Sequence, residues 1–296
     1  MPDLPDVIQW AIPLYALAML VEIGCGARFG TARYETRDTL TSLTVSVWFL
    51  AHAVLFGFVG IWLLDTVQER FGLIDWQWHP VAFALCLVLD DLRKYALHRV
   101  QHRVRWFWAA HVTHHSSQHY NLSVALRNPP TVLFTLPFLF RLPLALLGFP
   151  IEMILFTAGL DSIYQFFTHT ELIRRMPAWF EQVFVSPAHH RVHHATNPRY
   201  LDSNYGSMFI VWDRLFGTFV DEDDAEPCRY GLVKNLGSFH PVRVVFHEWV
   251  HLVQDVLRPG LRMRDRLGYV FGPPGWSHDG SRETTAMLRT RHARAE

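Results

Sequence analysis

Long apolar segments in the first 168 residues constrain the fold of this chain more than any other feature. The segment 43–64 contains no Asp, Glu, Lys or Arg. It is long enough for the roughly 20 residues that cross a hydrocarbon core of about 30 Å. Further apolar runs occupy 7–26, 80–89, 132–147 and 151–168. A soluble helical protein has little need for five such runs so close together, so we predict an all-α, multi-pass transmembrane helical bundle.

The apolar runs and the composition predict three parts of the chain. Residues 1–79 are predicted to form the N-terminal transmembrane helices, and 80–275 to form one larger domain. This domain includes a transmembrane hairpin at about 131–168, although Arg141 leaves open that the third and fourth runs are re-entrant. The stretch 276–296 is rich in Arg, Thr and Ser, and we expect it to be a disordered tail.

The distribution of arginine predicts the orientation of the bundle. Arg28, Arg33 and Arg37 lie in the first loop, whereas the N-terminus is acidic. An excess of Arg marks a cytoplasmic loop. If the third helix then returns to the cytoplasm and the hairpin leaves and re-enters from that side, 98–128 and 169–296 both lie there. The sequence therefore predicts a helical cap on the cytoplasmic side.

Histidine is unusually frequent, with 18 residues in 296, and much of it is clustered. One cluster has the spacing H-x3-H and two have the spacing H-x2-H-H. On a helix, side chains three and four residues apart lie on one face, with their Cβ atoms about 5–6 Å apart. Neutral imidazole is a ligand for Fe, Zn, Cu or Ni. The candidate metal ligands are His98, His102, His111, His114, His115, His190, His193 and His194.

The number of clustered histidines predicts a dinuclear site. A single tetrahedral zinc takes about four protein ligands, so eight clustered histidines suit two metal ions held side by side. Histidines at the level of the lipid headgroups would explain isolated residues such as His52, but not a repeated ligand spacing. His169 leaves the fifth apolar run on the same side. It is a further candidate ligand, although a lone histidine is more often an ordinary surface residue.

Two carboxylates are candidates for supporting the metal ligands. Asp91 lies seven residues before His98 on the same helical stripe, where it could accept the second imidazole N–H and fix the tautomer. Alternatively, Asp91 is an interfacial charge paired with Arg93 or Lys94. Glu171, close to His169, is a similar candidate. Both are proposed as catalytic-site residues.

Two other function classes compete with the dinuclear site. His247, Glu248 and His251 form an H-E-x-x-H pattern, which is typical of zinc hydrolases. That reading needs a third ligand, and the segment 239–256 has the spacing of an amphipathic helix lying on the membrane or on the cap. A bis-histidine haem electron carrier is the other alternative, but clustered ligands do not suit one axial histidine per helix. Equal counts of 27 basic and 27 acidic residues argue against a nucleic-acid partner.

Four longer motifs carry a family resemblance. The motifs are HVTHHSSQHYNLSVALR at 111–127, QFFTHTE at 165–171, SPAHHRVHHATN at 186–197 and DSNYGSMFIVWDRLFGTF at 202–219. With these motifs the sequence resembles the fatty acid hydroxylase and sterol desaturase superfamily of membrane non-haem di-iron oxygenases over about 80–275, and within it the alkylglycerol monooxygenase branch. The GPPGW sequence at 272–276 is also similar to that branch.

The resemblance implies a catalytic domain at 80–275 that uses two iron ions and O₂. It implies iron ligation by the eight clustered histidines, with His169 as the ninth ligand. The implied substrate is a lipid, such as an ether lipid, a sterol or a fatty acyl chain, that is hydroxylated, desaturated or cleaved. The protein would be integral to the membrane, in the cytoplasmic membrane of a bacterium or the endoplasmic reticulum of a eukaryote. Its active site would face the cytoplasm.

The sequence also departs from the family pattern. Lys94 and Tyr95 stand where paired tyrosines are common, Gln118 stands where an acidic residue is common, and Gln165 replaces a histidine of other branches. These departures bear on the substrate rather than on the metal. The sequence contains no H-P-G-G or G-x-G-x-x-G motif. We therefore expect a separate electron donor, either tetrahydrobiopterin or a cytochrome b5-type or ferredoxin-type reductant.

Overall fold

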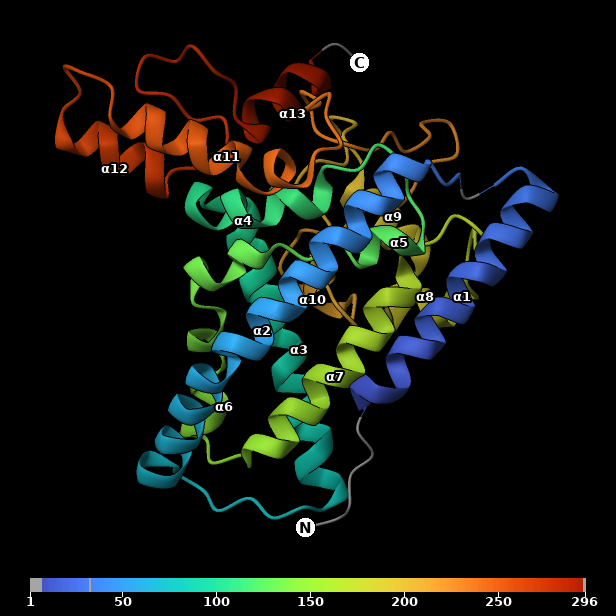
Figure 1. Cartoon of the computed structure of the whole chain (residues 1–296), viewed down its shortest axis with the longest axis vertical. Helices are drawn as coiled ribbons and strands as arrows, with labels where there is room; N and C mark the ends of the chain where they lie inside the picture. Colours follow the sequence, from blue (N-terminus) through green and yellow to red (C-terminus); the bar gives the residue numbers. More distant parts are fainter. Residues whose placement is uncertain (1–6, 32, 295–296) are drawn as a thin grey trace.

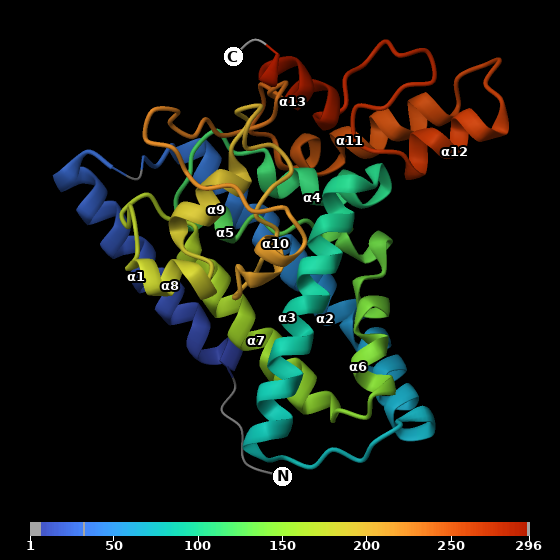
Figure 2. The ribbon, with the colours of Figure 1, turned by 180° about the vertical axis from the view of Figure 1, so that it is seen from behind.

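The computed structural model describes residues 7–31 and 33–294, and its regular structure is helical. Within these residues the only β-type pairings are two isolated bridges, Phe184–Phe209 and Ala195–Tyr230. The predicted all-α fold class is therefore confirmed. The helices divide into a set of long, apolar elements and a set of shorter ones gathered around one end of them, as Figures 1 and 2 show from opposite sides.

Helices α1 (Val7–Phe29) and α2 (Thr36–Phe71) are long and apolar enough to cross a membrane, by length and composition. Their apolar side chains are largely exposed: Val54 is 80% and Trp62 is 65% accessible. Exposed apolar surface of this extent is costly in water and favourable in lipid. With 36 residues, α2 is about 54 Å long, so it extends well beyond a hydrocarbon core of about 30 Å.

Helices α3 (Pro80–Arg103) and α7 (Ile151–Thr168) pack against each other beside α2 (Figures 1 and 2). Pro80 begins α3, and the His79 ring caps it by accepting the N–H of Ala82. The apolar core between α3, α6 (Leu142–Leu146) and α7 contains Cys86, Phe149 and Met153. The bounds of α7 are those of the fifth apolar run.

The fourth apolar run forms short helical pieces rather than one helix. They are η1 (Pro130–Thr135), η2 (Pro137–Arg141) and α6 (Leu142–Leu146). Pro137 and Pro143 lack the N–H that a continuous helix needs, and Leu136 has a φ of 47°. The turn into α7 requires glycine at position 148, where φ is 91° and a Cβ would lie 1.7 Å from the Ile74 oxygen.

Most of the shorter helices assemble at the C-terminal end of α3, at the top of Figure 1, whereas α8 (Ala178–Val183) and α10 (Val211–Leu215) lie lower, at about mid-height. Among them α11 packs on α4 and on α12. Residues 285–293, which we expected within a disordered tail, form α13, because Thr284 caps the helix and Arg282 binds Asp255 just before it. The helices are α4 (Arg105–His115), α5 (Leu122–Ala125), α8 (Ala178–Val183), α9 (Pro187–His194), α10 (Val211–Leu215), α11 (Pro241–Val256), α12 (Met263–Phe271) and α13 (Thr285–Ala293).

The orientation of the bundle is a testable prediction. Because Arg28, Arg33 and Arg37 surround the loop between α1 and α2, we expect that loop and the C-terminus to face the cytoplasm together. Reporter fusions after Gly30 and after Glu296, each active on one side of the membrane only, measure this directly. Fusions that report opposite sides would show that one of the predicted spans is wrong.

Candidate metal centre

The nine predicted histidines converge in two adjoining groups at the end of α3. The five-histidine group contains His98, His102, His111, His115 and His193. The four-histidine group contains His114, His169, His190 and His194. Within each group the candidate ligand atoms all lie within 4.8 Å of one another. The groups adjoin, because the rings of His115 and His194 stack with centroids 4.4 Å apart.

Helical geometry explains how the sequence clusters are divided. On α4, His111 and His115 are four residues apart and share a face, whereas His114 points to the other side of His111. On α9, His190 and His194 share a face in the same way and His193 points elsewhere. Each H-x2-H-H motif therefore gives a pair to one group and a single histidine to the other. His98 and His102 of α3 complete the five-histidine group, and His169 completes the four-histidine group.

The nitrogen–nitrogen distances fit ligands of a shared ion. The Nε2 atom of His111 lies 3.1 Å from that of His98 and 3.1 Å from that of His115. The Nε2 atom of His169 lies 3.2 Å from that of His114 and 3.0 Å from that of His190. Neighbouring ligands, each about 2.1 Å from one ion at near right angles, would be about 3 Å apart.

Backbone carbonyls fix the tautomers of three histidines. The Nδ1–H group of His98 donates to the Tyr205 carbonyl at 2.9 Å. In the same way His169 donates to the Gln165 carbonyl at 2.7 Å, and His193 donates to the Ser203 carbonyl at 2.9 Å. With the proton on Nδ1, the lone pair is on Nε2 and faces the group. This is the usual arrangement of histidines that bind metals.

The loop that follows α9 supplies much of this support, and sequence reasoning missed its role. Asp202 lies beside His102, with Oδ1 3.4 Å from Nδ1. Asp202 and Asn204 have φ values of 56° and 52°, a conformation that Asp and Asn tolerate better than most residues. The Asn204 side chain binds the carbonyls of His189 and Val220. The available signal was the DSNYG sequence, quoted above only for its resemblance.

Burial makes these histidines neutral and leaves some nitrogens without a partner. The pKa values of His111, His115, His193 and His194 are well below the usual value, because of burial first and then of repulsion from neighbouring histidines. Within the part of the chain that the structure describes, buried nitrogens without a hydrogen bond include Nε2 of His102, His193 and His194. A buried polar atom without a partner is destabilising. The donor set therefore fits metal cations, and nine nitrogens exceed what one ion takes.

Acid is expected to destabilise the metal-free protein. Burial lowers the pKa of His169 from 6.5 to about 4. Below pH 6.5 the unfolded chain therefore takes up a proton that the folded chain does not. Each such group then costs up to about 1.4 kcal/mol of stability per pH unit. Thermal unfolding of chelator-treated protein should show a steep fall of the midpoint from pH 7 to pH 5. A midpoint that is constant over this range would contradict buried neutral histidines.

The two predicted carboxylates lie near the site but do not hydrogen-bond to a histidine. Asp91 accepts hydrogen bonds from the N–H of Met208 at 2.7 Å and from the indole of Trp212 at 2.8 Å. It thus holds the segment around α10 against α3. This differs from the expected imidazole contact, because seven residues of helix separate Asp91 from His98 by about 10 Å. The Glu171 carboxylate accepts from the Tyr230 hydroxyl at 3.2 Å.

The H-E-x-x-H pattern does not form a metal site among the described residues. Glu248 binds the buried Arg105 at 2.7 Å, and His247 contacts the Val244 carbonyl on its own helix. His251 is on the surface, with 56% of its side chain exposed. Only the two histidine groups bring three or more candidate ligands together in the described chain. Four or five imidazoles around one point also leave no space for the flat ring of a haem.

Comparison with known proteins shows which family and which relatives the chain is similar to. Residues 83–218, which contain all nine histidines, match the family model Fatty acid hydroxylase. Over this segment, which is a little under half of the chain, the sequence is similar to the fatty acid hydroxylase family. It is 32% identical to the alkylglycerol monooxygenase of Xenopus tropicalis over 280 residues, which cover 93% of this chain and 60% of that protein. It is also 32% identical to the alkylglycerol monooxygenase of Homo sapiens, over 93% of this chain and 61% of that protein.

A more distant relative is the ornithine lipid hydroxylase OlsE of Rhizobium tropici. It is 31% identical over 146 residues, which cover 48% of this chain and 43% of that protein. This chain spans about 60% of the length of the two alkylglycerol monooxygenases described above. No solved structure matches the chain.

Proposed function

We propose that this protein is a di-iron membrane oxygenase that uses O₂ to hydroxylate, desaturate or cleave a lipid. The observation that carries the proposal is the convergence of nine buried or half-buried histidines in two adjoining groups. In this proposal the five-histidine group holds one ion and the four-histidine group holds the other. Relatives named as an alkylglycerol monooxygenase, an ornithine lipid hydroxylase and a sterol desaturase support lipid oxidation.

The chemistry of the reaction favours iron over zinc. Side chains alone cannot oxidise an unactivated C–H bond, so bound iron would supply the oxidising chemistry with O₂. Zinc has no redox chemistry and would leave the proposed reaction without an oxidant. The chain's own part is to present neutral Nε2 donors. The carbonyls of Gln165, Ser203 and Tyr205 hold the corresponding Nδ1 protons in place.

The position of the site suits a substrate that stays in the bilayer. The histidines lie at the end of α3, next to helices whose exposed surfaces are apolar. A lipid could keep its chains in the membrane while its reactive carbon reaches the metal centre. We propose an ether lipid as the first substrate to test, because two alkylglycerol monooxygenases align with 93% of the chain. The same reading places the protein in the membrane with several spans and its site on the cytoplasmic side.

The experiment is an oxidation assay with detergent-purified, iron-loaded protein. An alkylglycerol, a sterol and a fatty acyl lipid are each incubated with O₂ and a reductant, either tetrahydrobiopterin or a cytochrome b5-type or ferredoxin-type donor. Hydroxylation consumes the C–H bond, O₂, two electrons and two protons, and it yields the alcohol and water. With isotopically labelled O₂, we expect one labelled oxygen in the product. Turnover that persists under nitrogen or with a chelator would contradict the proposal.

A further inference from the structure

One stripe of side chains on α3 changes from apolar to basic along the helix. Val81, Leu85 and Val88 are exposed apolar residues at helical spacing, with 69%, 38% and 37% accessibility. At the same spacing the stripe continues through the apolar Leu92 and Ala96, and it ends in two arginines. These seven positions follow each other at intervals of three or four residues, so they lie along one side of the helix. The two arginines are Arg99 and Arg103.

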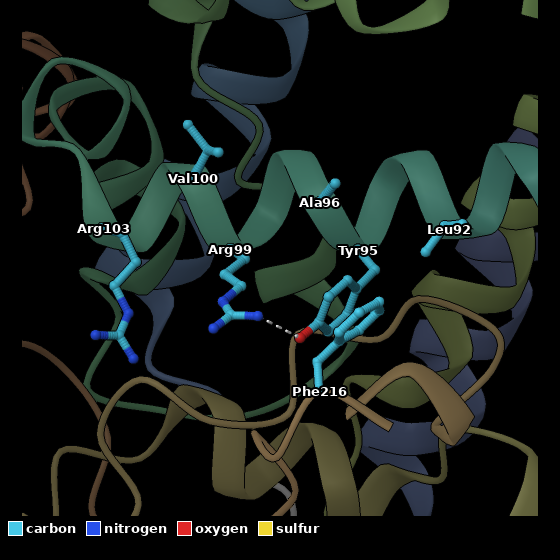
Figure 3. Close-up of a pocket in the computed structure, with 7 residues that line it drawn as sticks. All are labelled: Leu92, Tyr95, Ala96, Arg99, Val100, Arg103 and Phe216. Atoms are coloured by element: carbon cyan, nitrogen blue, oxygen red, sulfur yellow. Dashed lines mark hydrogen bonds between the residues drawn. The ribbon is translucent and has the colours of Figure 1, made fainter. Parts of the chain in front are cut away.

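The basic end of the stripe opens into a shallow groove of about 370 Å³. Leu92, Ala96 and Val100 of α3 line it together with Phe216, which follows α10. Figure 3 shows Tyr95, Arg99 and Arg103 extending from the same side of α3, with Phe216 beside the Tyr95 ring. The groove thus has apolar walls and two guanidinium groups at the end nearest the C-terminus of α3.

The charge of these two arginines is not neutralised by an ion pair within the described residues. Arg99 donates a hydrogen bond to the Tyr95 hydroxyl at 3.3 Å. Two nearby carboxylates attract these arginines, Asp202 for Arg103 and Asp213 for Arg99, but neither forms an ion pair with them. Asp202 lies against His102, and Asp213 accepts the N–H groups of Tyr205 and Gly206. Two arginines outside any ion pair can bind a phosphate, whose oxygens match the guanidinium geometry.

We propose that this groove binds a phospholipid with an anionic headgroup. Its acyl chain would lie along the apolar part of the stripe, and its phosphate would contact Arg99 and Arg103. The polarity of the stripe matches that of a bilayer, with the apolar part toward the core and the basic part at the interface. The stripe also continues the exposed apolar surface of α3. The inference rests on the proposed membrane placement of α3, but on neither the metal nor the reaction.

The bound lipid would lie one aromatic layer from the metal centre. The Tyr95 ring stacks on Phe216 at 5.3 Å and meets the Tyr205 ring edge-on at 6.2 Å. Tyr205 in turn packs against His98 and His102, at 5.8 and 5.3 Å. The groove is therefore a site separate from the two histidine groups, on the far side of Tyr95 and Tyr205.

The test measures lipid binding to the full chain, purified in detergent and not treated with a chelator. Phosphatidylglycerol, phosphatidylcholine and soluble glycerol phosphate are titrated, with thermal unfolding and native mass spectrometry as readouts. The wild-type protein should bind phosphatidylglycerol in preference to phosphatidylcholine. The double variant Arg99→Gln, Arg103→Gln should lose roughly 10- to 30-fold in affinity for phosphatidylglycerol. Arg262→Gln, Arg264→Gln is the matched control, because both side chains are exposed, at 65% and 70%, and lie outside the groove.

Three outcomes would overturn the inference. Equal binding of phosphatidylcholine would remove the role of charge, and unchanged binding by the groove variant would place the lipid elsewhere. Glycerol phosphate binding as tightly as phosphatidylglycerol would indicate a site for a soluble anion. Because no turnover is measured, failure here leaves the oxygenase proposal intact, and absence of oxygenase activity leaves this inference intact.

Discussion

Replacing His193 or His114 by alanine is expected to abolish lipid oxidation and to lower the amount of bound metal. His193 belongs to the five-histidine group and His114 to the four-histidine group, so each variant removes a ligand from one proposed ion. Loss of a supporting residue typically costs 10–100-fold in affinity or activity, and we expect loss of a ligand to cost more than about 100-fold. Product formation and metal per chain should be measured on the same preparations.

The control for these variants is His251→Ala. His251 is also a helical histidine, but it lies on the surface of α11, and among the described residues only Glu248 is close enough for an ion pair with it. We expect this variant to keep the metal content and the activity of the wild-type protein. The opposite pattern, with metal lost in His251→Ala and retained in His114→Ala, would favour the zinc hydrolase reading over a dinuclear histidine site.

Replacing Arg127 by methionine is expected to destabilise the protein by about 3–5 kcal/mol, since the substitution leaves Asp38 as an unpaired buried charge. Arg127 is 1% exposed and binds the Asp38 carboxylate at 2.5 Å. Its guanidinium also donates to the hydroxyls of Ser42 and Ser116. One side chain thereby joins the start of α2 to the end of α4, directly beside the histidine groups. The change in the free energy of unfolding is measured in detergent, by recording helicity as the denaturant concentration is raised.

Arg174→Met provides the comparison for this prediction. Arg174 pairs with Asp224 at 2.8 Å, but both side chains are about 70% exposed, at 73% and 68%. Exposed pairs of this kind contribute at most about 1 kcal/mol. If the two variants lose similar stability, the buried pair does not have the structural role assigned to it.

The local part of the metal site was accessible from sequence. Spacings of three and four residues on α3, α4 and α9 are visible without any knowledge of the fold, because they follow from the pitch of one helix. The division of each H-x2-H-H motif between two groups follows from the same pitch, but only once the helices are placed around a centre. His169 was found because it follows a long apolar helix that ends at the same place.

Contacts between distant segments were not accessible in this way. The approach of Asp202 to His102 spans 100 residues. The DSNYG sequence favours a left-handed turn at Asp202 and Asn204, but it does not indicate which distant residue the turn meets. Asp91 has the helical spacing expected of a residue that supports a histidine ligand, yet in the fold its carboxylate accepts the backbone N–H of Met208. The fourth apolar run had the length of a helix, and its prolines, Pro137 and Pro143, were the signal of the break that our prediction did not use.

Metal analysis of the detergent-purified protein tests the central claim most directly. We expect about two metal ions per chain and no haem absorption, since nine ligands exceed the roughly four to six positions of a single ion. Zinc binds nitrogen ligands more tightly than Fe²⁺, so two zinc ions from overexpression would equally support the dinuclear site. His193→Ala should lower this number, and His251→Ala should not. One metal ion per chain that remains bound after substitution of both His114 and His193 would contradict the account.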